Sequence, residues 1–288
     1  MRPGFCTSLA ALSLLAGCSG VPAPATPSAP VITGAGVRFT KKPPSVGTVI
    51  VTRERNETRM EMDITVDGKA RHSSSVVVQT VERRAEVLAM GADGAPTRIR
   101  VAYQTNHKEE AGKGPVAAPV EGKTYLVEGH GGDAPSVTDA AGNPPSEAEA
   151  KAVATDFKHL GRVDPFWHGL PERPLAAGER VDDMAKVVLA DDAADGLEQV
   201  QLHFEGPRDV RGSPAGVFAV QVSGKLAGDT PVTVDGKVAL LLASGWEAES
   251  DADIPLDISQ QQTRDGSAVS IVAHGKMHLH TETSYEGK

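Results

Sequence analysis

The feature that most constrains this chain is an alternation of apolar and polar residues with a period of two. It is clearest in residues 58–66, where every second residue is apolar. Successive side chains of a β-strand point to opposite faces, so this segment predicts a strand with one buried face. Asp67-Gly68 follows directly and favours a tight hairpin turn.

The same alternation returns along most of the chain. Further strands are predicted at residues 70–90, 98–106, 123–129, 136–138, 181–190, 199–205, 217–226, 238–242, 254–258 and 269–283. Gly91 to Gly94 and Asp235-Gly236 predict turns between them. Strands of this kind predict a mainly β (α+β) fold of antiparallel meander sheets, which a curved, open half-barrel would satisfy.

One packed, amphipathic helix is predicted between the two strand-rich parts, over residues 146–161. Ser146 and Glu149 have the capping-box spacing, and apolar residues recur at i, i+4 and i+7. The folded part, residues 45–288, is then either one β-rich domain or two halves joined by this helix and a linker at 162–178. Both arrangements fit the sequence.

The N-terminus carries a second kind of signal. Arg2 precedes an apolar run from Thr7 to Ala16, which is too short to span a bilayer and is typical of a secretory signal peptide. The run ends at Leu15-Ala16-Gly17-Cys18. This tetrapeptide resembles the lipobox of bacterial lipoproteins, and the resemblance covers residues 1–18.

The resemblance implies that residues 1–17 are a signal peptide and that Cys18 is acylated after cleavage. The partner would then be a membrane, bound through the acyl chains on Cys18. Two or three chains hold a protein there, whereas one dissociates readily. Ser19, in place of aspartate, implies a cell-envelope location at the outer membrane. The alternative is an ordinary signal peptide with a chance cysteine.

Residues 18–44 are rich in proline and alanine, which predicts an extended tether rather than helix or strand. After cleavage, 28 basic and 38 acidic residues remain, a net charge of −10. Nucleic acid is therefore not an expected partner, because it calls for a basic face. The two cysteines, Cys6 and Cys18, leave no free thiol for a disulfide, a metal ligand or a nucleophile.

The sharpest cluster of candidate site residues lies near the C-terminus. His274, His278 and His280 share one face of a predicted strand and are the candidate metal ligands. His278 and His280 lie two residues apart, and Glu282 or His203 could join this pair as a third ligand for zinc or copper. Lys276 lies among them and would repel a cation. The alternative interpretation is a polar, half-exposed strand face, and no cofactor is expected.

No catalytic motif is present: the chain has neither a Gly-x-Ser-x-Gly elbow nor a phosphate-binding loop. The pattern Leu-Pro-x-x-Pro-Leu-x-x-Gly-Glu at residues 170–179 resembles a segment of uncharacterised β-rich envelope proteins. These features favour a non-enzymatic envelope lipoprotein that binds a lipophilic ligand or an envelope protein. The alternatives are a structural scaffold without a small-molecule site and, third, a metal-binding protein or hydrolase.

Overall fold

The computed structural model describes residues 36–129, 131, 134–192, 197–226, 230–264 and 267–287. Its strands are β1 (Val49–Val66), β2 (Lys69–Met90), β3 (Pro96–Glu110), β4 (Val116–Ala117), β5 (Thr124–Glu128), β6 (Ser136–Asp139), β7 (Glu179–Arg180), β8 (Leu197–Val210), β9 (Ser213–Leu226), β10 (Thr230–Leu241), β11 (Glu247–Arg264) and β12 (Ser267–Glu286). Its helices are α1 (Glu147–Asp156), α2 (Pro165–Gly169) and α3 (Asp182–Asp192). Cys18 and the signal peptide lie outside the described residues.

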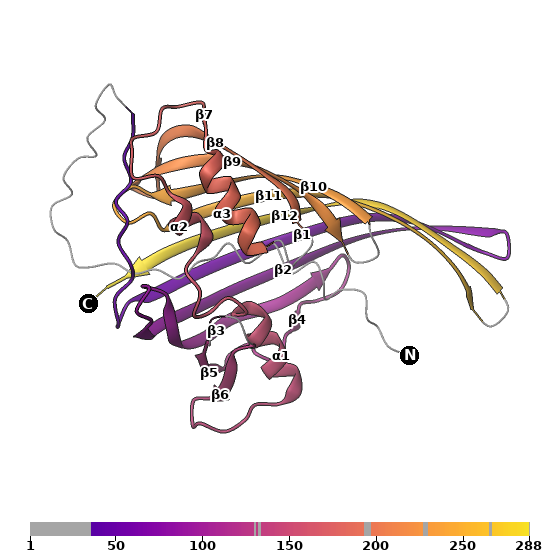
Figure 1. Ribbon diagram of the computed structural model, residues 1–288. Helices are drawn as coiled ribbons and strands as arrows, with labels where there is room; N and C mark the ends of the chain where they lie inside the picture. Colours follow the sequence, from indigo (N-terminus) through magenta and orange to yellow (C-terminus); the bar gives the residue numbers. More distant parts are fainter. Residues whose placement is uncertain are drawn as a thin grey trace.

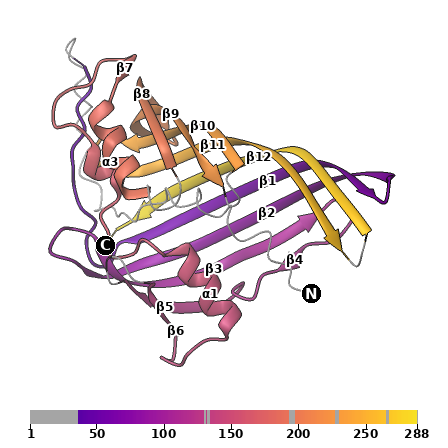
Figure 2. The same cartoon turned by 45° about the vertical axis from the view of Figure 1, so that its right-hand side comes forward.

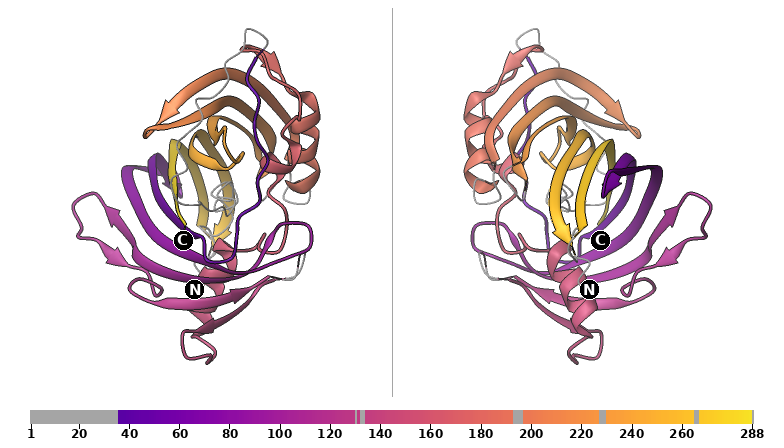
Figure 3. Two further views of the ribbon diagram at one scale, coloured as in Figure 1. Left: turned by 90° about the vertical axis from the view of Figure 1, so that its left-hand side faces the viewer. Right: turned by 90° about the vertical axis from the view of Figure 1, so that its right-hand side faces the viewer.

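All twelve strands belong to one antiparallel sheet with the order β6-β5-β3-β2-β1-β12-β11-β10-β9-β8-β7, and β4 pairs with β3. The chain runs outward from β1 to β6, crosses over through the helices, and returns from β7 to β12 (Figure 1). The first and last strands therefore meet in the middle of the sheet. The end-on views in Figure 3 show a strongly curved sheet that stays open. The predicted mainly β, antiparallel, open architecture is confirmed.

The four central strands are much longer than their neighbours and project beyond them. β3 pairs with β2 only from Val77 onward, and β10 pairs with β11 only as far as Asp253. The remaining described parts of the two hairpins, residues 58–76, 254–264 and 267–277, form a four-stranded extension, here called the ribbon (Figures 1 and 2). Asp67 and Gly68 both have positive φ at its tip, so the predicted hairpin turn is confirmed.

The two faces of the sheet differ in composition. The face here called inner carries two large apolar clusters, one over β8–β12 with α2 and α3, the other over β1–β5 with α1. The face here called outer carries the alternate residues of the central strands, most of them polar or charged. Successive residues of a strand point to opposite faces, so the period of two in the sequence places the apolar residues on the inner face and the polar residues on the outer face.

The predicted helix forms, and its capping box is confirmed. Ser146 accepts a hydrogen bond from the Glu149 backbone N–H, and the Glu149 carboxylate accepts one from the Ser146 backbone N–H. The structure adds two helices. The strand predicted at 181–190 is wrong, because this segment contains α3. Its buried residues recur at i, i+3, i+4 and i+7, which is a helical period: they are Val181, Met184, Ala185 and Val188.

The turn predicted at Asp235-Gly236 is also wrong, because both residues lie inside β10. A Cβ atom at Gly236 would lie 2.6 Å from the backbone oxygen of Asp251, so this glycine permits a close approach of β10 to β11.

Part of the segment assigned to the tether is packed against the folded body. Val37 exchanges backbone hydrogen bonds with Leu175, and Phe39 lies in the core against Phe204 and Phe218. The described helices include none with the length and apolarity needed to cross a membrane.

Candidate functional site

The inner face of the ribbon is apolar along its centre. Ile64 of β1 lies opposite Ile271 of β12, and Met62 lies opposite Ala273. Ile258 of β11 lies on the other side of Ala273. Ala273 is buried and the other four are half-buried. Together they form a continuous apolar surface on two hairpins.

The described helices leave this surface uncovered. In Figures 1 and 2 they lie over the other part of the sheet. The core cluster beneath α3 ends at Leu256 and Met60, near the base of the ribbon. Among the described residues, neither of the two large clusters includes the apolar residues beyond that point. At the tip, Val66 is 39% exposed.

A buried ion pair separates the two clusters on the inner face. Arg83 of β2 donates a hydrogen bond of 2.5 Å to Glu54 of β1, and both side chains are more than 90% buried. Arg83 also contacts Asp156 at the end of α1, and that carboxylate accepts a hydrogen bond from Tyr103. Burial raises the pKa of Glu54, and the charge of Arg83 only partly offsets this effect.

A second acidic residue lies at the base of the sheet. Glu247 is buried and accepts a hydrogen bond of 2.8 Å from Ser250. Burial raises its pKa well above the usual range, and the neighbouring charges of Asp164 and Glu54 raise it further, which favours the neutral acid. This polar region belongs to the packed body and does not extend into the ribbon.

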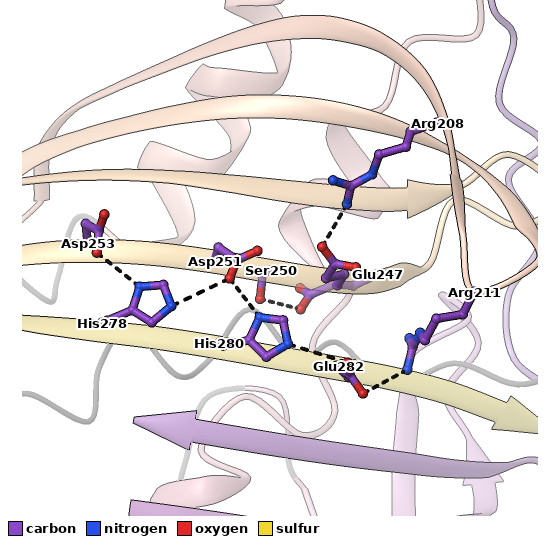
Figure 4. Close-up of polar contacts among 10 residues, drawn as sticks. Arg208, Arg211, Glu247, Ser250, Asp251, Asp253, His278, His280 and Glu282 are labelled. Carbon is purple, nitrogen blue, oxygen red and sulfur yellow. Dashed lines mark hydrogen bonds and ion pairs between the residues drawn. The ribbon is translucent and has the colours of Figure 1, made fainter. Parts of the chain in front are cut away.

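The outer face carries the predicted histidines. β11 presents acidic residues and β12 presents basic ones, and the antiparallel register sets them opposite one another. The resulting network runs from Asp253 through His278, Asp251, His280 and Glu282 to Arg211 (Figure 4). Lys276 extends it by an ion pair of 3.0 Å with Asp253. The charges of this network alternate in sign, so each group has an opposite charge beside it when the histidines are protonated.

The structure brings His278, His280 and Glu282 into one network but does not gather them around a point. His278 pairs with Asp253, His280 with Asp251, and His274 with a separate carboxylate, Asp257. Within the described parts of the chain, no three His, Cys, Asp or Glu side chains are placed to hold a metal ion. Metal binding at His274, His278 and His280 stays a prediction that these pairings do not favour.

His203 does not join this group. It lies on β8, and three strands separate β8 from β12.

His280 makes a testable contribution to stability. Its partial burial lowers the pKa, but the hydrogen bonds and charges of Asp251 and Glu282 outweigh this effect and raise the pKa above its ordinary value. The interactions that raise the pKa contribute their full stabilisation when the pH is below the unfolded-state pKa of about 6.5. This stabilisation is lost as the pH rises through the folded-state pKa. The substitution His280→Gln should therefore lower the free energy of unfolding at pH 5.5, by less than about 1 kcal/mol. At pH 8 the loss should be smaller still.

Urea unfolding at several pH values measures this difference. His72→Gln is the matched control, because His72 and its partner Asp63 are both more than half exposed. A larger loss for His280→Gln at pH 8 than at pH 5.5 would contradict the assignment.

Sequence reasoning missed the buried ion pair and Glu247. A signal was present: Glu54 occupies an even position in phase with the inward-facing Met60 and Met62, and Arg83 falls in phase with Val81. Charged residues at inward positions of neighbouring strands would predict a buried pair, once the pairing of those strands is known.

Comparisons with known proteins assign no family to this chain. No family model matches it, and a search of curated proteins finds no match. It is similar to a solved structure of a DUF1329 family protein from Desulfovibrio piger, with 12% identity, coverage of 82% of this chain and 85% of that chain, and a TM-score of 0.25.

It is also similar to a solved domain from Vibrio parahaemolyticus described as an outer membrane lipoprotein-sorting protein. The identity is 10%, the coverage is 84% of this chain and 86% of that chain, and the TM-score is 0.22. Similarity at this level supports no conclusion about the fold or the function of this chain.

Proposed function

We propose that this chain is a lipid-anchored, non-enzymatic protein of the bacterial cell envelope that binds a lipophilic ligand on the inner face of the ribbon. The observation that carries the proposal is the apolar surface around Ile64 and Ile271, which no described helix covers. Removing such a surface from water is favourable by roughly 25 cal/mol per Å², so an apolar ligand would bind there.

The anchor part of the proposal rests on the sequence alone. The lipobox-like Leu15 to Cys18 and the proline-rich segment after it would attach the protein to the membrane, with Ser19 favouring the outer membrane.

Replacement of Ile64 by aspartate should weaken binding of an apolar ligand on the order of tenfold or more, because the carboxylate would lose hydration on contact with it. The measurement is a fluorescence titration with N-phenylnaphthylamine, an uncharged apolar dye, using the chain from Ser19, which keeps every described element. Native mass spectrometry of the gently purified chain should also detect a bound mass of lipid size.

The matched control is Thr65→Asp, which places the same new charge one residue away on the outer face. Both variants should keep the wild-type circular dichroism spectrum. A wild-type chain that fails to bind the dye, or equal weakening by both variants, would refute ligand binding on this face.

A scaffold function is the second candidate, and the edges of the ribbon favour it. Residues 69–75 of β2 pair only with β1, and the described part of β11 beyond Asp253 pairs only with β12. The unpaired edge of a strand can add a strand from a protein partner. Failure of dye binding, together with co-purification of one envelope protein that Pro substitutions at this edge abolish, would favour the scaffold.

A further inference from the structure

Charge is divided unequally between the two faces of the ribbon. The acidic residues on its described strands lie at outer-face positions of β1 and β11: they are Glu61, Asp63 and Asp257. Among the residues whose side chains the structure describes, the charged ones on the inner face of the ribbon are Lys69 and Arg71, and both are basic. By register, Arg264 of β11 also takes an inner-face position near the tip. This segregation stands out because the whole chain has a net charge of −9.

The two cations border the apolar surface. Lys69 of β2 lies opposite Val66, and Arg71 lies opposite Ile64, which in turn faces Ile271 of β12. Both basic residues are exposed, and no described residue forms an ion pair with either. The acidic residue closest in sequence, Asp67, lies in the turn at the tip.

An apolar strip with cations at one end matches an amphiphile with an anionic head. Residues 58–66 of β1 span about 26 Å, which is long enough for an extended acyl chain. The arginine guanidinium can bind phosphate through two parallel hydrogen bonds, and the lysine ammonium adds a point charge. A carboxylate or phosphate head placed at the opposite end of the strip would find no free cation among the described residues of this face.

We infer that the ligand is an anionic phospholipid, with its acyl chains along Met62, Ile64 and Ile271 and its phosphate at Lys69 and Arg71. This inference rests on the proposed function and adds the class and the orientation of the ligand. The selectivity comes from the head, because the apolar strip alone would accept any acyl chain.

Two short-chain lipids with identical acyl groups test the inference. Dioctanoylphosphatidylglycerol carries the phosphate and dioctanoylglycerol lacks it, and each can displace the apolar dye from the chain that begins at Ser19. We expect the phospholipid to bind more tightly on the order of tenfold. Lys69→Gln/Arg71→Gln should remove this preference and leave dioctanoylglycerol binding unchanged.

The control is Arg59→Gln/Lys276→Gln, which removes two cations that lie opposite each other on the outer face. It should keep the preference for the phospholipid. Equal affinity of the wild type for both lipids, or equal loss from both double variants, would overturn the inference while leaving lipophilic binding intact. Failure of the phospholipid to displace the dye would overturn it too, whereas failure of dye binding itself would overturn the proposed function.

Discussion

Replacement of Arg83 by methionine is expected to lower the free energy of unfolding by about 3–5 kcal/mol at pH 7. Glu54 would lose the cation that it contacts and would stay buried without compensation. The packed position would also lose the contact between the guanidinium and the Phe157 ring, 5.5 Å away. Urea unfolding followed by circular dichroism gives the size of the loss.

The loss should shrink as the pH falls. Removing Arg83 raises the pKa of Glu54 further above its unfolded value of about 4.3, so the folded state binds a proton that the unfolded state lacks. The free energy of unfolding of Arg83→Met then rises as the pH falls toward the unfolded-state pKa of Glu54. For the same reason Glu54→Gln should recover part of the stability of Arg83→Met.

Arg84→Met is the matched control, because Arg84 is the next residue on β2 and points to the outer face. Its partner Glu286 is 56% exposed, so this pair should contribute less than about 1 kcal/mol. Equal losses for Arg83→Met and Arg84→Met, or no recovery in the double variant, would show that the buried pair does not stabilise the fold as expected.

The parts of the fold that the sequence predicted are those set by local chemistry. The alternation around Met62 depends only on which side chains are apolar, and the Asp67-Gly68 turn depends only on residues that tolerate positive φ. The capping box at Ser146 is likewise a contact between residues three apart. Each of these features forms in the structure as predicted.

The errors arose where contacts distant in sequence decided the outcome. At Asp235-Gly236 the turn chemistry is overruled, because β10 pairs with strands on both sides and Gly236 accommodates the close approach of β11. In α3 the apolar residues satisfy a helical period as well as a run of strand-like length. As a helix, this segment packs its apolar face against β8.

The candidate site was only half predictable. The alternation within each strand divides its residues between two faces. Ile64 can therefore be grouped with the residues of β1 that share its face, and Arg71 with those of β2. It does not say that β1 pairs with β12, the strand farthest from it in the chain, or that Ile271 therefore faces Ile64. The outer-face histidines were identified as a set for the same reason, but their partners on β11 required the register.

Replacement of Cys18 by serine is expected to abolish incorporation of radioactive palmitate, if the lipobox-like sequence acts as proposed. Serine has no thiol to receive the lipid, so the variant would lose all its acyl chains. Each buried methylene contributes about 0.8 kcal/mol to membrane binding, so losing two or three chains should move the protein from the detergent phase to the aqueous phase in a phase-partition assay. The measurement compares label and partition for the wild type and the variant.

Cys6→Ser provides the control within the same segment. Cys6 lies in the part that signal cleavage would remove, so this variant should be labelled and should partition like the wild type. An ordinary signal peptide with a chance cysteine at position 18 makes a different prediction: the wild type itself would take up no label. In our proposal the ligand binds to the ribbon, which lies far along the chain from Cys18. The Cys18→Ser chain should therefore still bind the apolar dye, and this result would separate the anchor from the ligand surface.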